Sequence, residues 1–133
     1  MNAIYFIYFI GLDVHKKTVS FCIKTASGEI VREGKLAARR EELRAWAAAL
    51  PGPWRGGMEA TLFSAWIYDT LQPYAQQLLV GHPARMQAIC AGKKKSDHLD
   101  ARTLADLLRA HLFPACYMLP PELRDLRRWL RYR

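Results

Sequence analysis

Apolar residues fill the first segment of the chain and then begin to alternate with polar ones. Residues 4–14 are rich in Ile, Tyr and Phe, which is the pattern of a strand buried on both faces of a sheet. Residues 18–25 carry apolar side chains at every second position and predict a half-buried strand. Residues 26–29 are a turn signal containing glycine, and residues 30–36 return as a third strand. The opening of the chain therefore predicts an antiparallel meander of three strands.

Further along, the apolar residues become spaced three and four apart, which predicts helices between short strands. The predicted helices cover residues 39–50, 62–74, 83–91 and 97–111. The predicted strands between them cover residues 54–60 and 77–80. Three antiparallel strands followed by strand–helix units make a mixed five-stranded sheet with helices on both faces. We therefore predict an α/β fold with the ribonuclease-H-like order of elements.

The last segment of the chain has a different character. Residues 122–133 are strongly basic, and their apolar side chains recur at helical spacing without a cap or stop signal at the end. We therefore expect one domain over residues 1–115, and over residues 116–133 the start of a basic carboxy-terminal helix that is cut in its middle. Such a helix with an apolar stripe is typical of a coiled coil that pairs with another chain.

Charge narrows the class of partner. The chain has 20 Lys and Arg against 12 Asp and Glu, a formal charge of +8, and a hydrophobic fraction of 51%. The apolar content indicates a globular protein rather than a disordered one. The basic balance predicts contact with nucleic acid or another anionic surface, with a merely solvated basic surface as the alternative.

The cysteines and the apolar amino terminus indicate a cytoplasmic protein. Cys22, Cys90 and Cys116 lie far apart and lack the Cys-x-x-Cys spacing of metal or redox sites, so we expect reduced thiols. The apolar run at residues 3–10 has no basic residue before it and no cleavage site after it. It also falls far short of the ~20 residues that span a bilayer, so no membrane partner is expected.

Two aspartates behind a run of lysines are the first candidate for chemistry. Asp97 and Asp100 follow Lys93, Lys94 and Lys95 at the predicted start of a helix. Residues three apart share one helix face, so the two carboxylates would lie side by side and suit Mg²⁺ or Mn²⁺. Lysines suit the phosphates of a nucleic acid. An N-cap with a favourable helix-dipole contact explains the same aspartates, and the local sequence leaves both interpretations open.

Two further carboxylates follow predicted strands. Asp13 comes at the end of the first strand and Glu59 at the end of the fourth, and these strands are neighbours in the predicted order. Together with Asp97 and Asp100 they would supply four oxygen donors, enough for one or two Mg²⁺ ions in phosphoryl transfer. A metal-bound water or hydroxyl can then attack, so no side chain need act as the base.

Nearby polar residues are predicted to have lesser roles. Asp106 lies about half a turn out of phase with Asp97 and should face away. His15, His82 and His98 flank the predicted site, and we expect them to donate or accept hydrogen bonds because Mg²⁺ prefers oxygen. Residues predicted to contact nucleic-acid phosphates are the following: Lys16, Lys17, Arg85, Lys93, Lys94, Lys95 and Arg102.

Four blocks of sequence, in order and over nearly the whole chain, resemble one family. They are Gly-Leu-Asp-Val-His-Lys-Lys (11–17), Met-Glu-Ala-Thr (58–61), His-Pro-Ala-Arg (82–85) and Lys-Ser-Asp-His-Leu-Asp-Ala (95–101). The set is similar to the amino-terminal domain of the DEDD transposases of the insertion-sequence family called IS-one-ten, which includes Piv-type DNA invertases. One departure is the segment 62–66, where the family usually has Gly followed by an aromatic residue.

The resemblance implies a fold similar to Holliday-junction resolvases and a tetrad at Asp13, Glu59, Asp97 and Asp100 that uses magnesium. It also implies DNA as substrate, a structured guide RNA, assembly as a homo-oligomer, and a second domain with a catalytic serine. This chain stops at Arg133, near the expected start of the coiled coil, so that serine is missing from it.

Two functions follow as hypotheses. The first is the metal-binding half of a transposase that acts by Mg²⁺-dependent phosphodiester strand exchange. The second is a catalytically incomplete fragment that only binds RNA or DNA. An actin-like sugar kinase, which can also open with Gly-Leu-Asp, is excluded because the chain lacks glycine-rich phosphate loops and sufficient length.

Overall fold

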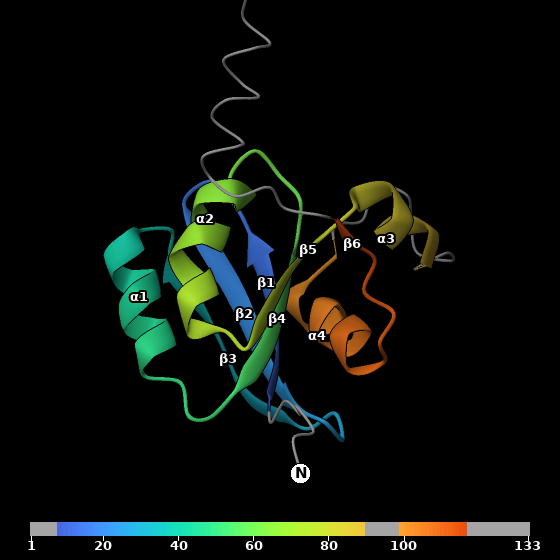
Figure 1. Cartoon of the computed structure of the whole chain (residues 1–133), viewed down its shortest axis with the longest axis horizontal. Helices are drawn as coiled ribbons and strands as arrows, with labels where there is room; N and C mark the ends of the chain where they lie inside the picture. Colours follow the sequence, from blue (N-terminus) through green and yellow to red (C-terminus); the bar gives the residue numbers. More distant parts are fainter. Residues whose placement is uncertain (1–7, 90–98, 117–133) are drawn as a thin grey trace, which may run out of the picture.

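A mixed β-sheet runs through the centre of the described chain and carries helices on both faces (Figure 1). The computed structural model describes residues 8–89 and 99–116. Within these residues the strand order is β3-β2-β1-β4-β5-β6. The strands are β1 (Tyr8–Val14), β2 (Thr18–Thr25), β3 (Ile30–Ala37), β4 (Trp54–Glu59), β5 (Gln77–Gly81) and β6 (Ala115–Cys116).

The predicted order of the first five strands is confirmed. Strands β1, β2 and β3 pair as an antiparallel meander, and β1 also pairs in parallel with β4, which pairs in parallel with β5. Strand β1 therefore lies inside the sheet, flanked by β2 and β4. Residues 4–7 of the predicted first strand lie outside the described residues.

The prediction of five strands is wrong by one, because the described chain adds β6. Its two residues pair antiparallel with the end of β5, at Val80↔Cys116 and Gly81↔Ala115. A strand this short leaves no periodic signal, and its partner is remote in sequence. The strand also spans the predicted domain boundary at residue 115.

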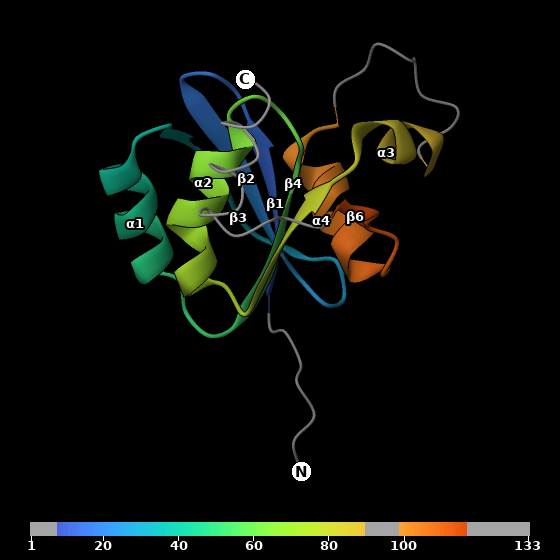
Figure 2. The same ribbon diagram turned by 45° about the horizontal axis from the view of Figure 1, so that its top comes forward.

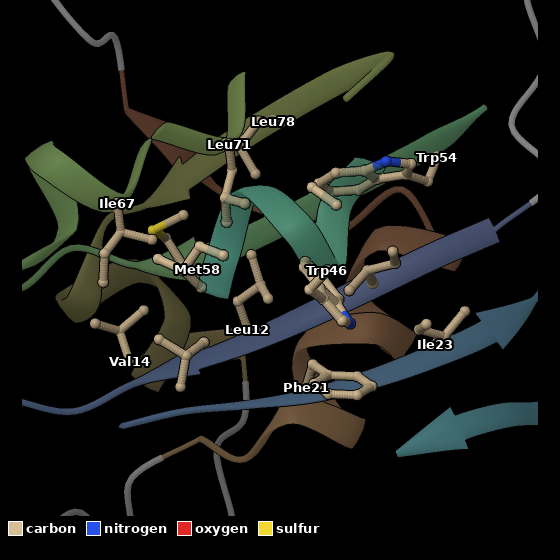
Figure 3. Close-up of a cluster of buried hydrophobic side chains, with 14 of the residues drawn as sticks. Leu12, Val14, Phe21, Ile23, Trp46, Trp54, Met58, Ile67, Leu71 and Leu78 are labelled. Atoms are coloured by element: carbon tan, nitrogen blue, oxygen red, sulfur yellow. The ribbon is translucent and has the colours of Figure 1, made fainter. Parts of the chain in front are cut away.

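One face of the sheet is covered by α1 (Arg40–Ala48) and α2 (Ser64–Leu71), which continues as the 3₁₀ helix η1 (Gln72–Tyr74). The predicted helix at 62–74 is shorter as an α-helix because proline at position 73 lacks the N–H that would extend the helical bonding. Figure 3 shows apolar side chains from these helices packed against the sheet. This core includes Leu12, Phe21, Trp46, Trp54, Met58, Ile67 and Leu71.

The opposite face carries α3 (Pro83–Ile89) and α4 (Ala101–Arg109), as Figure 2 shows from a second direction. A smaller apolar cluster lies there and is made of Phe9, Met86, Leu99, Leu104, Leu107, Leu108 and Phe113. The prediction that β2 is half-buried is wrong, because α4 covers its second face. Cys22 is fully buried and Lys24 is only 7% exposed.

Helix α4 lies directly on strand β1 at Gly11. A Cβ atom on Gly11 would overlap the carbonyl oxygen of Ala101 and lie 2.7 Å from the nitrogen of Ala105. Only a residue without a side chain allows two backbones to approach this closely. The glycine of the Gly-Leu-Asp block is therefore a packing requirement of the fold.

Charged side chains hold the other half of α4 to the β2–β3 hairpin. Lys24 donates to Asp106 Oδ1 at 2.8 Å, and Arg109 Nη2 lies 3.2 Å from the same oxygen. Arg109 also donates to the carbonyl of Ala26 at 3.0 Å. Burial raises the pKa of Asp106, but the hydrogen bonds from Lys24 and Arg109 outweigh burial and hold that pKa below its ordinary value. Asp106 thus points to the hairpin and has a structural partner there.

Within the described residues, every helix is too short or too polar to cross a bilayer.

The contact at Gly11 can be tested by adding one methyl group. We expect Gly11→Ala to lower the free energy of unfolding by about 3 kcal/mol, because the clash is with helix backbone that cannot turn aside. Gly34→Ala is the matched control, since its Cβ would meet the ring of Phe21 at 2.9 Å and a single ring can shift. Urea denaturation measures both variants, and equal losses would contradict the close-packing argument.

The pair between Lys24 and Asp106 can be tested by stability and by pH. Asp106→Asn should lower the free energy of unfolding by about 2 kcal/mol at pH 7, because it leaves a buried ammonium without its anion. Lys24→Met in that background should restore part of the loss by removing the buried charge. Glu29→Gln, at an exposed turn residue, is the control.

The pH dependence of the same comparison has a definite sign. The pKa of Asp106 in the folded protein lies below its ordinary 3.8, so its contribution is complete above that pH. As the pH falls below 3.8, the difference between the wild type and Asp106→Asn should disappear. A difference that grew on acidification would contradict the assignment.

Candidate functional site

Asp13 and Glu59 lie side by side at the ends of neighbouring parallel strands. The register of β1 with β4 ends at Leu12↔Met58, and each carboxylate belongs to the next residue along its strand. Leu12 and Met58 are buried in the core under α1 and α2. Because successive side chains alternate between the faces of a sheet, Asp13 and Glu59 both face α4. Two strands thus deliver carboxylates to one edge and one face of the sheet.

Asp100 comes to the same place from the start of α4. A cavity of about 260 Å³ opens beside the first turn of this helix, and both Asp13 and Asp100 line it. Its other lining residues are Ser20, Phe21, Glu33, Gly34, Ala101 and Arg102. Glu59 lies outside this lining set, so the cavity joins two of the predicted carboxylates rather than three.

The predicted helix start at residue 97 is wrong, because α4 begins at Ala101 and Asp100 is its N-cap. Asp100 has extended backbone angles, and its Oδ1 accepts a hydrogen bond of 2.8 Å from the backbone N–H of Thr103. Asp100 therefore precedes the helix instead of sharing a helical face with Asp97. The capping interpretation holds for Asp100, although a carboxylate has lone pairs for a cation as well.

The rest of the predicted lysine–aspartate stretch lies outside the described residues. This concerns the predicted helix residue Asp97, the predicted phosphate contacts Lys93, Lys94 and Lys95, and the flanking His98.

His15 contacts the first carboxylate. Its Nε2 lies 3.2 Å from Asp13 Oδ1, with the Asp13 side chain 13% exposed and the imidazole 52% exposed. His15 follows β1 directly, so a short turn brings its ring back onto Asp13. This matches the expectation of a hydrogen-bonding role, and it holds the Asp13 carboxylate in one orientation.

Arg102 has a partner that local sequence patterns do not reveal. Its Nε donates to Glu33 Oε1 at 2.5 Å and its Nη2 donates to Glu33 Oε2 at 2.8 Å. This hydrogen bonding lowers the pKa of Glu33 and raises the pKa of Arg102. Glu33 is 69 residues away in the chain, so only the packing of α4 on the hairpin makes the pair. The predicted phosphate contact at position 102 is thus bound to a carboxylate in this structure.

The other described basic candidates lie on the surface. Lys16 and Lys17 are exposed in the turn that follows Asp13, and Arg85 is exposed on α3. Their side chains are accessible to a phosphate backbone. The two lysines also lie at the strand edge that presents the carboxylates.

The candidate ligand atoms are carboxylate oxygens, which is the atom type that a hard divalent cation prefers. Carboxylate oxygens are the ligands that Mg²⁺ and Mn²⁺ prefer, and Asp13, Glu59 and Asp100 face the same layer. Within residues 8–89 and 99–116, no group of three His, Cys, Asp or Glu side chains converges closely enough to hold a metal ion. Asp97 lies outside these described residues.

Comparison with known families gives an independent assignment. The family model for transposases of the DEDD type from IS110 (IS-one-ten) elements matches residues 10–133. The chain therefore belongs to the insertion-sequence transposases of the IS110 family, as its sequence blocks predict. No curated protein matches the chain in sequence. At the level of the family, membership indicates an enzyme that cuts DNA and uses a divalent metal.

The capping role of Asp100 can be separated from its charge. Asp100→Ala should lower the free energy of unfolding by about 1 kcal/mol, because the N–H of Thr103 loses its acceptor. Asp100→Asn should cost less, since asparagine caps helices about as well as aspartate. Thermal and urea denaturation measure both, and an equal loss in the two variants would argue against the cap.

Proposed function

We propose that this chain is the metal-binding domain of a transposase, in which Asp13, Glu59, Asp97 and Asp100 hold Mg²⁺ or Mn²⁺ for phosphodiester strand exchange on DNA. The observation that carries the proposal is the pair of adjacent parallel strands that carry Asp13 and Glu59 at their carboxyl-terminal ends. A second observation supports it, since Asp13 and Asp100 line one cavity. The family match supports a reaction on DNA of the transposase kind.

The order of the strands supports a ribonuclease-H-like fold as part of the same proposal. An antiparallel meander is followed by two parallel strands, with β1 beside both β2 and β4. In such an arrangement the carboxyl end of β1 meets that of β4, and a late helix covers both. Asp13, Glu59 and Asp100 occupy these three places.

Each side chain has a specific task in this proposal. The carboxylates would bind the cation and fix its position, and a bound divalent ion would stabilise charge on the phosphodiester and activate a water or hydroxyl. His15 holds Asp13 in one orientation through the 3.2 Å contact. The nucleic-acid phosphates are bound by basic side chains: Lys16, Lys17, Arg85, Lys93, Lys94 and Lys95.

Further parts of the proposal rest on the family and the sequence. They are a structured guide RNA as second partner, the domain division at residue 115, and assembly as a homo-oligomer through residues 116–133. The formal charge of +8 supports a nucleic-acid partner of either kind.

The metal site is tested by titrating Mn²⁺ into the full chain and into charge-neutral variants. Asp13→Asn and Asp100→Asn should each weaken binding at least ~10-fold, because each removes an anionic ligand while keeping size and, at Asp100, the helix cap. Glu41→Gln, exposed on α1 across the sheet, is the matched control and should bind as the wild type does. Isothermal calorimetry gives the affinities.

Two results would overturn the proposal. If Asp13→Asn and Asp100→Asn bound Mn²⁺ as tightly as the wild type, these carboxylates would not be ligands. If the wild type bound duplex DNA or RNA but no divalent metal, the chain would be a nucleic-acid-binding fragment without strand-exchange chemistry.

A further inference from the structure

The ion pair between Glu33 and Arg102 lies at the rim of the cavity that Asp13 and Asp100 share. It is bidentate, with two parallel hydrogen bonds that fix the relative orientation of its groups. Glu33 belongs to the edge strand β3, and Arg102 lies two residues after Asp100 in the first turn of α4. The pair therefore ties the start of α4 to the edge strand β3 of the sheet.

The pair lines up with the close contact at Gly11. In the sheet register Gly11 is opposite Cys22, and Cys22 is opposite Glu33. Gly11 admits the backbone of Ala101, and Glu33 binds the next residue, Arg102. The first turn of α4 is thus held at two points along one line across three strands.

Cys22 lies between Gly11 and Glu33 on that line, and its thiol carries no charge. Burial, and after it the charge of Glu33, together raise the pKa of the Cys22 thiol to about 11. The thiol therefore stays protonated and donates a hydrogen bond to Glu33. The Glu33 carboxylate is thereby held by a neutral donor from the neighbouring strand β2 and by a cation from α4.

Helix stability alone gives no reason for an arginine at this place. A cation in the first turn is opposed by the positive end of the helix dipole. Both side chains are also partly exposed, Glu33 at 35% and Arg102 at 61%, and exposed ion pairs add little to global stability. The orientation of the helix start is what the pair determines.

We propose that Glu33 and Arg102 are positioning residues that hold the first turn of α4 so that Asp100 stays beside Asp13 and can share a cation with it. The inference rests on the proposed metal site and adds to it two residues outside the carboxylate tetrad. Neither side chain touches the metal or the DNA in this account, and both act through the place of Asp100.

Simple electrostatics and positioning predict opposite changes in Mn²⁺ affinity for the Arg102→Gln variant. If only charge mattered, Arg102→Gln would remove a repulsive cation and strengthen Mn²⁺ binding, while Glu33→Gln would weaken it. If positioning matters, both variants weaken binding, because either one releases the helix start. The double variant should then be no weaker than a single one, since both remove the same interaction.

The experiment is a double-variant cycle in the full chain, with Mn²⁺ affinity measured by calorimetry. Glu33→Gln, Arg102→Gln and the double variant should each bind about 10-fold more weakly than the wild type. Arg102→Lys, which keeps the charge but loses the bidentate geometry, should have an Mn²⁺ affinity between those of the wild type and Arg102→Gln. The melting temperature should stay within a few degrees for all of them, since an exposed pair adds little to global stability.

Several outcomes overturn the inference and differ from failure of the metal site. A wild type that binds Mn²⁺ and loses it in Asp13→Asn, with Glu33→Gln and Arg102→Gln unchanged, refutes positioning alone. Tighter binding in Arg102→Gln assigns the effect to charge. If metal affinity is unchanged but Arg102→Gln lowers the salt slope of duplex DNA binding by about 1, Arg102 is a phosphate contact instead. A wild type without Mn²⁺ affinity refutes the metal site itself.

Discussion

The structure depends on the close approach of α4 to strand β1 at Gly11. The backbone of Ala101 lies where a side chain at position 11 would be, so the helix sits lower on the sheet than ordinary side chains allow. This low position buries the second face of β2 and brings Asp106 within 2.8 Å of Lys24. It also sets Asp100 next to Asp13. The missing side chain at Gly11 therefore positions one helical layer of the fold and one of the three described carboxylates of the candidate site.

Local patterns in the sequence are enough to predict the first five strands, their order in the sheet and the strand ends that carry Asp13 and Glu59. Buried strands and amphipathic helices leave periodic signals, and the connection rules leave few ways to arrange them. The start of α4 was misplaced because an Asp-x-x-Asp pattern fits both a helical face and a cap, and the cap at Asp100 prevailed.

The features that the sequence could not show all depend on contacts between distant segments. Glu33 and Arg102 belong to different periodic elements, and nothing in either neighbourhood marks them as a pair. The burial of Cys22 and Lys24 is caused by a helix that begins almost 80 residues later in the chain. The two residues of β6 form a strand only because they pair with the end of β5. Such features become visible only once the helix is placed on the sheet.

The two faces of strand β1 have different environments. Leu12 and its alternate neighbours pack under α1 and α2, while Gly11 and Asp13 face α4. Since successive side chains alternate, inserting a single residue between Leu12 and Asp13 would put both side chains on the same face. Either the carboxylate would then enter the apolar layer or the leucine would face the cavity. The spacing along this strand is therefore as constrained as its composition, and relatives of this chain should tolerate exchange of its apolar residues far more readily than a change in its length.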